Sequence, residues 1–352
     1  MAFRTQPHLT AFSLCLCLLT LGDSARANRL PAADSRLPVS DLQADPAIPT
    51  IRAALGYDWA TAITSHAQME RYLQELVKSA PDRTLLVRYG TSYEGRGLYY
   101  LAVTSAENRR RLEEIRTANQ RLADPRLADA DEARRLVAEL PALVWLAASV
   151  HGNELSCTEA ALLAAYHLLA DTRPETQAML EKLVVLIDPL QNPDGRERYV
   201  NVYRESRGRF PNANPLSTEH AERWPGGRFN HYLFDMNRDW FLQSQQETVH
   251  KVRAYLKWQP QLYVDMHEMG HNSTYFFVPP ADPINPFVLH SQMEWLWDLG
   301  RQQAEWFDRR GFSYTTREMF DAFYPGYGSK WPLLQGGIGV LWEQAGTRGL
   351  LV

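Results

Sequence analysis

One apolar run constrains the fold of this chain more than any other stretch. Residues 142–150 (ALVWLAASV) have the length and the β-branched and aromatic content of a fully buried strand at the centre of a sheet. Residues 183–188 (LVVLID) and 338–342 (IGVLW) have the same character. Helical patterns separate these runs. The sequence therefore predicts an α/β fold with a mixed central sheet and helices on both faces.

The other elements follow from hydrophobic periodicity and turn residues. Helices are predicted at residues 64–79, 107–122, 129–139, 156–169, 174–182, 243–256 and 287–310. Further strands are predicted at residues 261–266 and 275–278, and at 85–89 and 98–103, which form a hairpin. Residues 189–195 (PLQNPDG) are predicted to be a turn, and residues 196–234 a long irregular segment that forms a wall of a site.

Composition limits the classes of partner. The 352 residues are 45% hydrophobic and 22% charged, as in an ordinary globular protein, and the net charge is −4. The sequence contains no basic tract of the kind that binds nucleic acid, so no nucleic-acid partner is expected.

The N-terminus has the three parts of a secretory signal peptide. Arg4 is followed by the apolar residues 9–22 (LTAFSLCLCLLTLG), and residues 25–27 (ARA) form a small-residue cleavage site. The apolar run is short for crossing a bilayer. We therefore expect residues 1–27 to be removed, leaving no membrane span, and the protein to be exported to the periplasm or the extracellular space.

The exported chain is expected to have no internal disulfide. Two of the three cysteines lie within the signal peptide, and only Cys157 remains, as a small hydrophobe in a buried helix. Residues 28–60 are rich in Pro, Ala and Asp and are read as an N-terminal extension. Residues 61–352 then form a single catalytic domain.

Two candidate metal ligands follow the central strand. His151 and Glu154, in the sequence HGNE, are three residues apart where the strand ends, and Gly152 allows a sharp turn between them. Catalytic groups in open α/β sheets gather at the carboxyl ends of strands. The spacing alone is a weak signal, because H-x-x-E occurs readily by chance.

A second histidine permits two zinc sites. Residues 267–271 (HEMGH) match H-E-x-x-H, in which both histidines bind zinc from one helical face and Glu268 is the general base. In the other arrangement, His267 ends the 261–266 strand and joins His151 and Glu154, leaving a fourth position for water. The extended pattern before the motif favours the second arrangement.

Several motifs occur together in order. HGNE, Asn-Pro-Asp-Gly, Asn-Arg-Asp-Trp, a strand-end His and a late Glu at the end of a third strand resemble the zinc carboxypeptidase (funnelin metallocarboxypeptidase) family, in a secreted bacterial-type member. The resemblance runs from about residue 64 to the C-terminus and includes the Gly-Thr-Ser-Tyr-Glu-Gly-Arg turn of the hairpin.

The resemblance implies a zinc site with one Zn²⁺ per chain. His151, Glu154 and His267 would bind the ion, and Asp235 would orient a histidine ligand. Glu343 would be the general base, which takes a proton from the zinc-activated water and returns it to the leaving amine.

The resemblance also implies substrate contacts. Asn237 and Arg238 would bind the free C-terminal carboxylate of a peptide, and Tyr324, in preference to Tyr327, would close over it. The arginine that stabilises the carbonyl oxyanion is expected after Asn-Pro-Asp-Gly. Arg204 and Arg207 are both candidates for this role, and Arg204 is preferred.

The predicted activity is therefore that of a zinc-dependent metallocarboxypeptidase. Three alternatives stay open: an amidase or deacylase of the same fold acting on peptidoglycan or acyl amino acids, an H-E-x-x-H zincin endopeptidase, and a non-catalytic binding domain. The chain ends nine residues after Glu343, where the family's domain continues with another helix, so we expect a fragment of a longer protein or a trimmed end. No side-chain preference is predicted, because residues 310–335 show no readable pattern.

Overall fold

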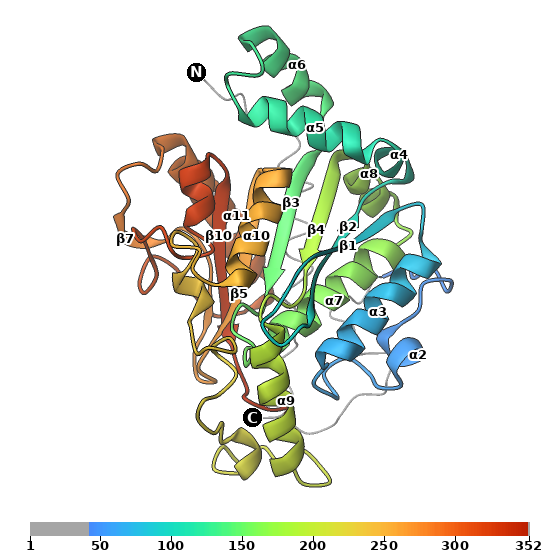
Figure 1. Ribbon diagram of the computed structural model, residues 1–352, viewed down its shortest axis with the longest axis vertical. Helices are drawn as coiled ribbons and strands as arrows, with labels where there is room; N and C mark the ends of the chain where they lie inside the picture. Colours follow the sequence, from blue (N-terminus) through green and yellow to red (C-terminus); the bar gives the residue numbers. More distant parts are fainter. Residues whose placement is uncertain (1–41, 351–352) are drawn as a thin grey trace.

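The computed structural model describes residues 42–350 (Figure 1). Within these residues an eight-stranded sheet forms the centre of the molecule. In spatial order its strands are β1 (Thr84–Thr91), β2 (Gly97–Val103), β4 (Leu183–Asp188), β3 (Ala142–Ala148), β5 (Leu262–Met269), β10 (Ile338–Ala345), β6 (Tyr275–Phe276) and β8 (Tyr314–Thr315). A separate pair joins β7 (Ala281–Ile284) to β9 (Asp321–Ala322).

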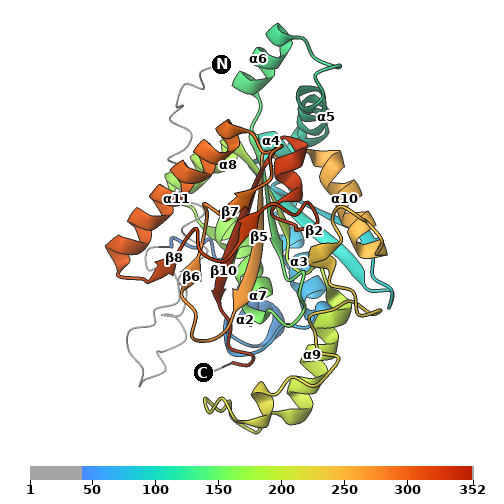
Figure 2. The same cartoon turned by 90° about the vertical axis from the view of Figure 1, so that its left-hand side faces the viewer.

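Helices cover both faces of the sheet. They are α2 (Ile51–Leu55), α3 (His66–Ser79), α4 (Ala106–Arg110), α5 (Leu112–Ala123), α6 (Ala130–Glu139), α7 (Leu155–Ala170), α8 (Pro174–Lys182), α9 (Pro193–Ser206), α10 (Gln246–Trp258) and α11 (His290–Arg310). Short 3₁₀ helices are η2 (Thr218–His220), η3 (Met236–Arg238) and η4 (Trp331–Gln335). Figure 2 shows α11 and α10 on opposite sides of the sheet. The predicted mixed sheet with helices on both faces is confirmed.

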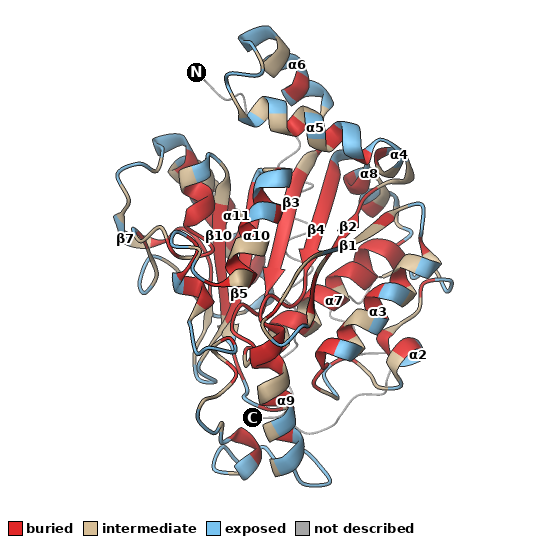
Figure 3. Ribbon diagram, viewed as in Figure 1, coloured by how far each residue is buried: buried red, intermediate tan, exposed pale blue. Residues whose placement is uncertain are grey.

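The four central strands β4, β3, β5 and β10 are parallel, and they are buried on both faces (Figure 3). Successive side chains point to opposite faces. On β3, Val144 and Leu146 pack in one core with α7 and α11, while Trp145 packs in a second core with Trp258 of α10. Burial on both faces explains why these strands are continuous apolar runs in the sequence. Their carboxyl ends meet at one edge of the sheet.

The chain turns sharply after β3. Ser149 has a left-handed backbone, with φ 51°, which is unusual for a non-glycine residue. Its hydroxyl lies 3.0 Å from the carbonyl oxygen of Glu154 and 2.9 Å from Thr158 Oγ1, so hydrogen bonds stabilise the turn. Gly152 then passes so close to α9 that a Cβ atom there would lie 2.1 Å from the backbone nitrogen of Arg196. The HGNE segment is thus held between the sheet and α9.

The Asn-Pro-Asp-Gly sequence begins a helix, and the prediction of a turn followed by an irregular segment was wrong for residues 193–206. Asn192 is the N-cap of α9, and its Oδ1 accepts a hydrogen bond from the backbone of Gly195 at 2.9 Å. Pro193 takes the first helical position, and Asp194 lies in the first turn. Asn, Pro and Asp in this order are a helix-start signal that the turn interpretation overlooked.

The β1–β2 turn docks on this helix start. Asp194 is buried, and its carboxylate accepts hydrogen bonds from Ser92 Oγ at 2.6 Å and Arg96 Nη1 at 2.7 Å. A buried carboxylate needs such partners to offset the cost of leaving water. The predicted hairpin therefore helps to hold α9 against the carboxyl edge of the sheet.

The described part of the N-terminal extension packs on the domain. Ile48 and Ile51, the latter in α2, are buried in the same core as α3. The signal peptide predicted for residues 1–27 lies outside the described residues. No helix within residues 42–350 has the length and apolar character needed to cross a membrane. Cys157 is free and buried in α7.

The close approach of Gly152 to α9 makes a stability prediction. Replacing Gly152 with Ala forces the HGNE segment and α9 apart, and we expect the free energy of unfolding to fall by about 1–3 kcal/mol. Gly270→Ala is the matched control, because a Cβ atom there meets only Ser273 Oγ at 3.9 Å. Denaturant unfolding of both variants checks this. Equal stability of the two variants would contradict the proposed packing.

Candidate functional site

Three side chains that could hold a metal ion meet at the carboxyl edge of the sheet. Glu154 Oε1 lies 2.6 Å from His151 Nδ1, and Glu154 Oε2 lies 3.0 Å from His267 Nδ1. Their ligand atoms all lie within 4.8 Å of one another, and all three residues are buried. His151 and Glu154 come from the turn between β3 and α7, whereas His267 lies on β5. The structure therefore brings together the three ligands predicted from separate strand ends.

Two aspartates lie behind the histidines. Asp235 Oδ1 is 3.0 Å from His151 Nε2, and Asp265 Oδ2 is 3.0 Å from His267 Nε2. A carboxylate at Nε2 favours the tautomer with the proton on that nitrogen, which leaves Nδ1 free to bind a metal. The sequence prediction included Asp235. For Asp265 it left two positions open, behind a ligand or on the surface, although this residue lies two positions before His267 on the same strand and faces the same side.

The donor set fits a metal ion. Glu154 Oε2 is buried and accepts no hydrogen bond from residues 42–350, although His267 Nδ1 is close to it. Burial alone would raise the pKa of Glu154, but the charges of His151 and His267 hold that pKa well below its usual range. Two imidazole nitrogens and an ionised carboxylate with an unsatisfied oxygen are the ligands of a catalytic zinc site.

The H-E-x-x-H arrangement is wrong for this fold. His267, Glu268 and Met269 belong to β5, and His271 follows in an exposed turn, so the two histidines do not share a helical face. The backbone nitrogen of Ser156 at the start of α7 donates a hydrogen bond to the Glu268 carboxylate at 2.6 Å. Glu268 therefore contributes to the contact between α7 and β5.

Glu343 lies on the strand next to the donors. In the parallel pairing of β10 with β5, Glu343 is directly opposite His267. It is buried, and burial raises the pKa of its carboxyl to about 7. Its side chain lines the same cavity as His151, Glu154 and His267. A carboxyl with a pKa near neutrality is suited to accepting and returning a proton.

Two of the three predicted substrate-binding residues line this cavity. Asn237 and Arg238 form part of η3 and line the cavity. Asn237 Oδ1 accepts a hydrogen bond from the backbone of Gly328 at 2.7 Å, and the Arg238 guanidinium lies 4.8 Å from the centre of the Tyr327 ring. Tyr327 lines the cavity, whereas the hydroxyl of Tyr324 donates to the carbonyl oxygen of Arg238 at 2.9 Å.

The structure does not bring Arg204 and Arg207 to the donors. Arg204 lies on an exposed part of α9, where its guanidinium is 3.5 Å from Gln68 Oε1, and Arg207 caps the end of the same helix. Arg228 lies at the site instead, with Nη1 3.3 Å from His151 Nδ1. The intervening segment has no periodicity that would have marked Arg228 in the sequence.

Two contacts fix Arg228. Its guanidinium donates to Asp235 Oδ2, from Nη2 at 2.8 Å and from Nε at 3.2 Å. Its carbonyl oxygen accepts a hydrogen bond from Asn192 Nδ2 at 3.0 Å. The Asn-Pro-Asp-Gly motif therefore positions a charged group of the site as well as starting α9.

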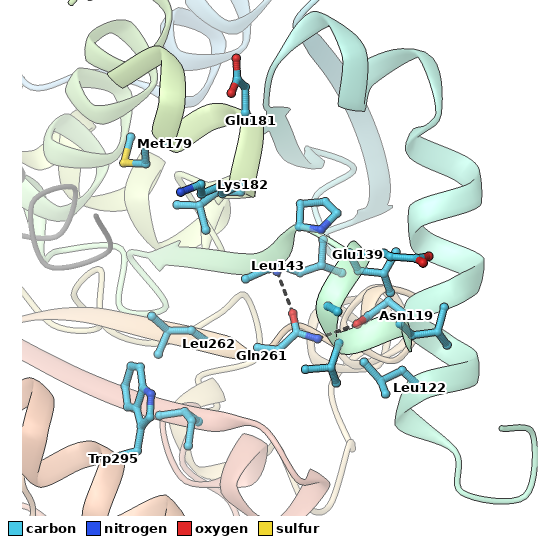
Figure 4. A pocket seen from close by; sticks show the side chains of 18 residues that line it. Asn119, Leu122, Glu139, Leu143, Met179, Glu181, Lys182, Gln261, Leu262 and Trp295 are labelled. Carbon is cyan, nitrogen blue, oxygen red and sulfur yellow. Dashed lines mark hydrogen bonds between the residues drawn. The ribbon is translucent and has the colours of Figure 1, made fainter. Parts of the chain in front are cut away.

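The site cavity has a volume of about 260 Å³ and adjoins a second hollow of about 490 Å³. The two share the lining residues Glu154, Arg228, Glu268 and Met269. A larger cavity of about 520 Å³ is lined mainly by apolar residues around α6 and the start of β3 (Figure 4). There Gln261 links the backbone of Leu143 to the side chain of Asn119. That cavity lies at the opposite end of β3 from the metal ligands.

The chain belongs to the zinc carboxypeptidase family, whose model matches residues 69–285. The matched residues include Asp235, Asn237 and Arg238 as well as the three candidate metal ligands. The resemblance inferred from the motifs is confirmed.

One curated relative and two solved structures illustrate the similarity. The curated relative, "Probable carboxypeptidase 2" of Trichophyton verrucosum (strain HKI 0517), is 30% identical over 141 residues, which are 40% of this chain and 21% of that protein. Carboxypeptidase A from Helicoverpa armigera has a TM-score of 0.54 and 19% identity, over 84% of this chain and 66% of that chain. Bovine thrombin-activatable fibrinolysis inhibitor, solved in complex with a tick carboxypeptidase inhibitor, has a TM-score of 0.52 and 15% identity, over 84% of this chain and 91% of that chain. At these identities the structures show the fold alone.

The positions of His267 and His271 predict which of the two is required for zinc binding. We expect His267→Ala to lose stoichiometric zinc, because it removes one of three ligands, whereas His271→Ala keeps zinc because that side chain is exposed and outside the group. Metal analysis of the purified variants after dialysis checks this. Loss of zinc from the His271 variant and retention in the His267 variant would support the H-E-x-x-H arrangement.

Proposed function

We propose that this chain is a zinc-dependent metallocarboxypeptidase that hydrolyses the C-terminal peptide bond of peptides. The main support is that a proton-accepting carboxylate, Glu343, lies opposite His267 in the cavity that also contains the metal ligands and the Asn237–Arg238 pair. One cavity thus combines a cation that can bind a substrate carboxylate, a candidate metal site and a base. This combination suits an enzyme that removes C-terminal residues. Zinc, when bound there, polarises a carbonyl oxygen and lowers the pKa of water to about 7.

The residues of the chain have distinct proposed roles. Arg238, half exposed at the mouth of the cavity, binds the terminal carboxylate together with Asn237. Glu343 accepts a proton from the attacking water and passes it to the nitrogen of the leaving residue. The adjoining hollow of about 490 Å³ offers room for the peptide on the other side of the scissile bond.

Arg228 replaces Arg204 in the proposed mechanism. Its guanidinium lies beside His151 Nδ1 and is fixed by Asp235, so it is oriented before substrate arrives. Donors that are already in place stabilise the negative charge that develops on the carbonyl oxygen. Tyr324 and Tyr327 stay candidates for closing over the substrate, and Tyr327 is the one that lines the cavity.

We also propose that residues 1–27 are a signal peptide that directs export, because they combine Arg4, an apolar run and a small-residue cleavage site. The catalytic domain is proposed to begin at residue 61, after a segment rich in Pro, Ala and Asp.

The role of Glu343 is tested by an isosteric change. Glu343→Gln keeps the shape of the side chain but cannot accept a proton, so we expect kcat for a peptide substrate to fall by about 10²–10⁴-fold with zinc retained. The measurement combines steady-state hydrolysis with metal analysis. Unchanged turnover in the zinc-loaded variant would contradict the assignment of Glu343 as the general base.

The role of Arg228 is tested against Arg204. We expect Arg228→Ala to reduce kcat by about 10²–10³-fold, because it removes a donor to the developing oxyanion. Arg204→Ala is the control and should leave kcat unchanged, since Arg204 is exposed away from the cavity. If Arg204→Ala lost turnover and Arg228→Ala kept it, the original prediction from the sequence would stand.

A further inference from the structure

The site cavity contains a buried lysine that the proposed reaction does not use. Lys330 lies between β9 and β10, at the start of η4, where its backbone nitrogen donates to the carbonyl oxygen of Tyr327 at 3.0 Å. Its side chain lines the cavity, yet the residue is only 4% exposed. This position places a positive charge inside the cavity instead of on its rim.

The ammonium group of Lys330 has no partner within residues 42–350. It forms no hydrogen bond and no ion pair within 4.0 Å with any described side chain, although three carboxylates are near enough to act on its charge. Each is engaged elsewhere: Asp265 lies 3.0 Å from His267 Nε2, Asp321 Oδ1 accepts from the backbone of Phe323 at 2.9 Å, and Glu343 faces the metal ligands.

A buried charge without a partner is costly. Burial lowers the pKa of Lys330 to about 8, and the nearby carboxylates oppose that shift. The group therefore stays mostly protonated at pH 7. Since none of these carboxylates forms an ion pair with Lys330, an anion that enters the cavity would gain a charge-assisted hydrogen bond in a poorly solvated place.

A second buried lysine provides a comparison. Lys251 of α10 lies 4.4 Å from the centre of the Trp240 ring, in the core, and does not line the site cavity. The contact of its ammonium group with the Trp240 ring in the core therefore accounts for the buried charge of Lys251. Lys330 differs because its side chain forms part of the wall of a substrate-sized space.

The two arginines that line the cavity already have roles. In the proposed function Arg228 stabilises the oxyanion, and the half-exposed Arg238 binds the terminal carboxylate. A peptide has only one terminal carboxylate, so the remaining cation, the buried Lys330, suits an anion on the side chain of the same residue. Phe320 and Leu341 also line the cavity and suit the methylene groups of such a side chain.

We propose that Lys330 binds the side-chain carboxylate of the substrate's C-terminal residue, so that peptides ending in an acidic residue are preferred. This inference rests on the proposed function, which it deepens by naming the substrate class.

The first test compares matched peptides. Peptides that differ only in a C-terminal Glu or Gln have the same shape but differ in charge. We expect the wild-type zinc enzyme to hydrolyse the Glu peptide with a kcat/KM about 10- to 100-fold higher. Peptides ending in Leu and Lys complete the series. A kcat/KM for the Glu peptide equal to or below that for the Gln, Leu or Lys peptide would overturn the inference and leave the proposed carboxypeptidase activity intact.

The second test assigns the preference to Lys330. Lys330→Met keeps a chain of similar length without the charge, and we expect the Glu-to-Gln ratio of kcat/KM to fall to about 1. Lys330→Arg should retain the preference, and Lys257→Met, an exposed lysine on α10, is the control for net charge. A purely structural role would lower kcat/KM for all peptides equally and keep the ratio, which would refute the assignment.

A binding measurement separates this inference from the proposed activity. Calorimetry with the zinc-loaded Glu343→Gln variant needs no turnover, and we expect it to bind the Glu peptide about 10-fold or more tightly than the Gln peptide. Tighter binding of the Glu peptide without hydrolysis by the wild type would support the role of Lys330 and contradict the carboxypeptidase activity. Equal binding of both peptides would contradict the role of Lys330.

Discussion

The carboxylate of Glu154, between the Nδ1 atoms of His151 and His267, is the contact on which the site depends. It joins the turn after β3 to β5, two segments that are separated by more than a hundred positions in the sequence. The left-handed turn at Ser149 brings Glu154 back beneath the sheet edge, and the pairing of β10 with β5 places Glu343 beside the same group. The fold thus positions the donors with rigid strands and one strained turn.

The electrostatics of the cavity follow from this cluster. Several ionised groups are buried within a small volume, and each costs free energy unless it is paired. Asp235 and Asp265 pair with the histidines, and the positive charge of Arg228 pairs with the carboxylate of Asp235. A metal ion would satisfy the free oxygen of Glu154. The ammonium group of Lys330 has no ion-pair partner among residues 42–350, which makes the cavity receptive to an anionic side chain.

The sequence predicted the centre of the structure and missed its periphery. The strand ends that carry His151, His267 and Glu343 were found because strands buried on both faces are continuous apolar runs, and parallel strands bring their ends together. Arg228 and Lys330 were missed because they lie in segments without periodicity, where only distant contacts decide which side chain enters the cavity. The start of α9 was misread because Asn-Pro-Asp-Gly suits a turn as well as a helix cap.

Anomalous diffraction at the zinc edge, from crystals of the zinc-loaded protein, shows whether His151, Glu154 and His267 hold one zinc ion. We expect one strong peak about 2.0–2.1 Å from Nδ1 of both His151 and His267 and about 2.0–2.2 Å from a carboxylate oxygen of Glu154. A peak coordinated by His271, or no peak between His151 and His267, would contradict it.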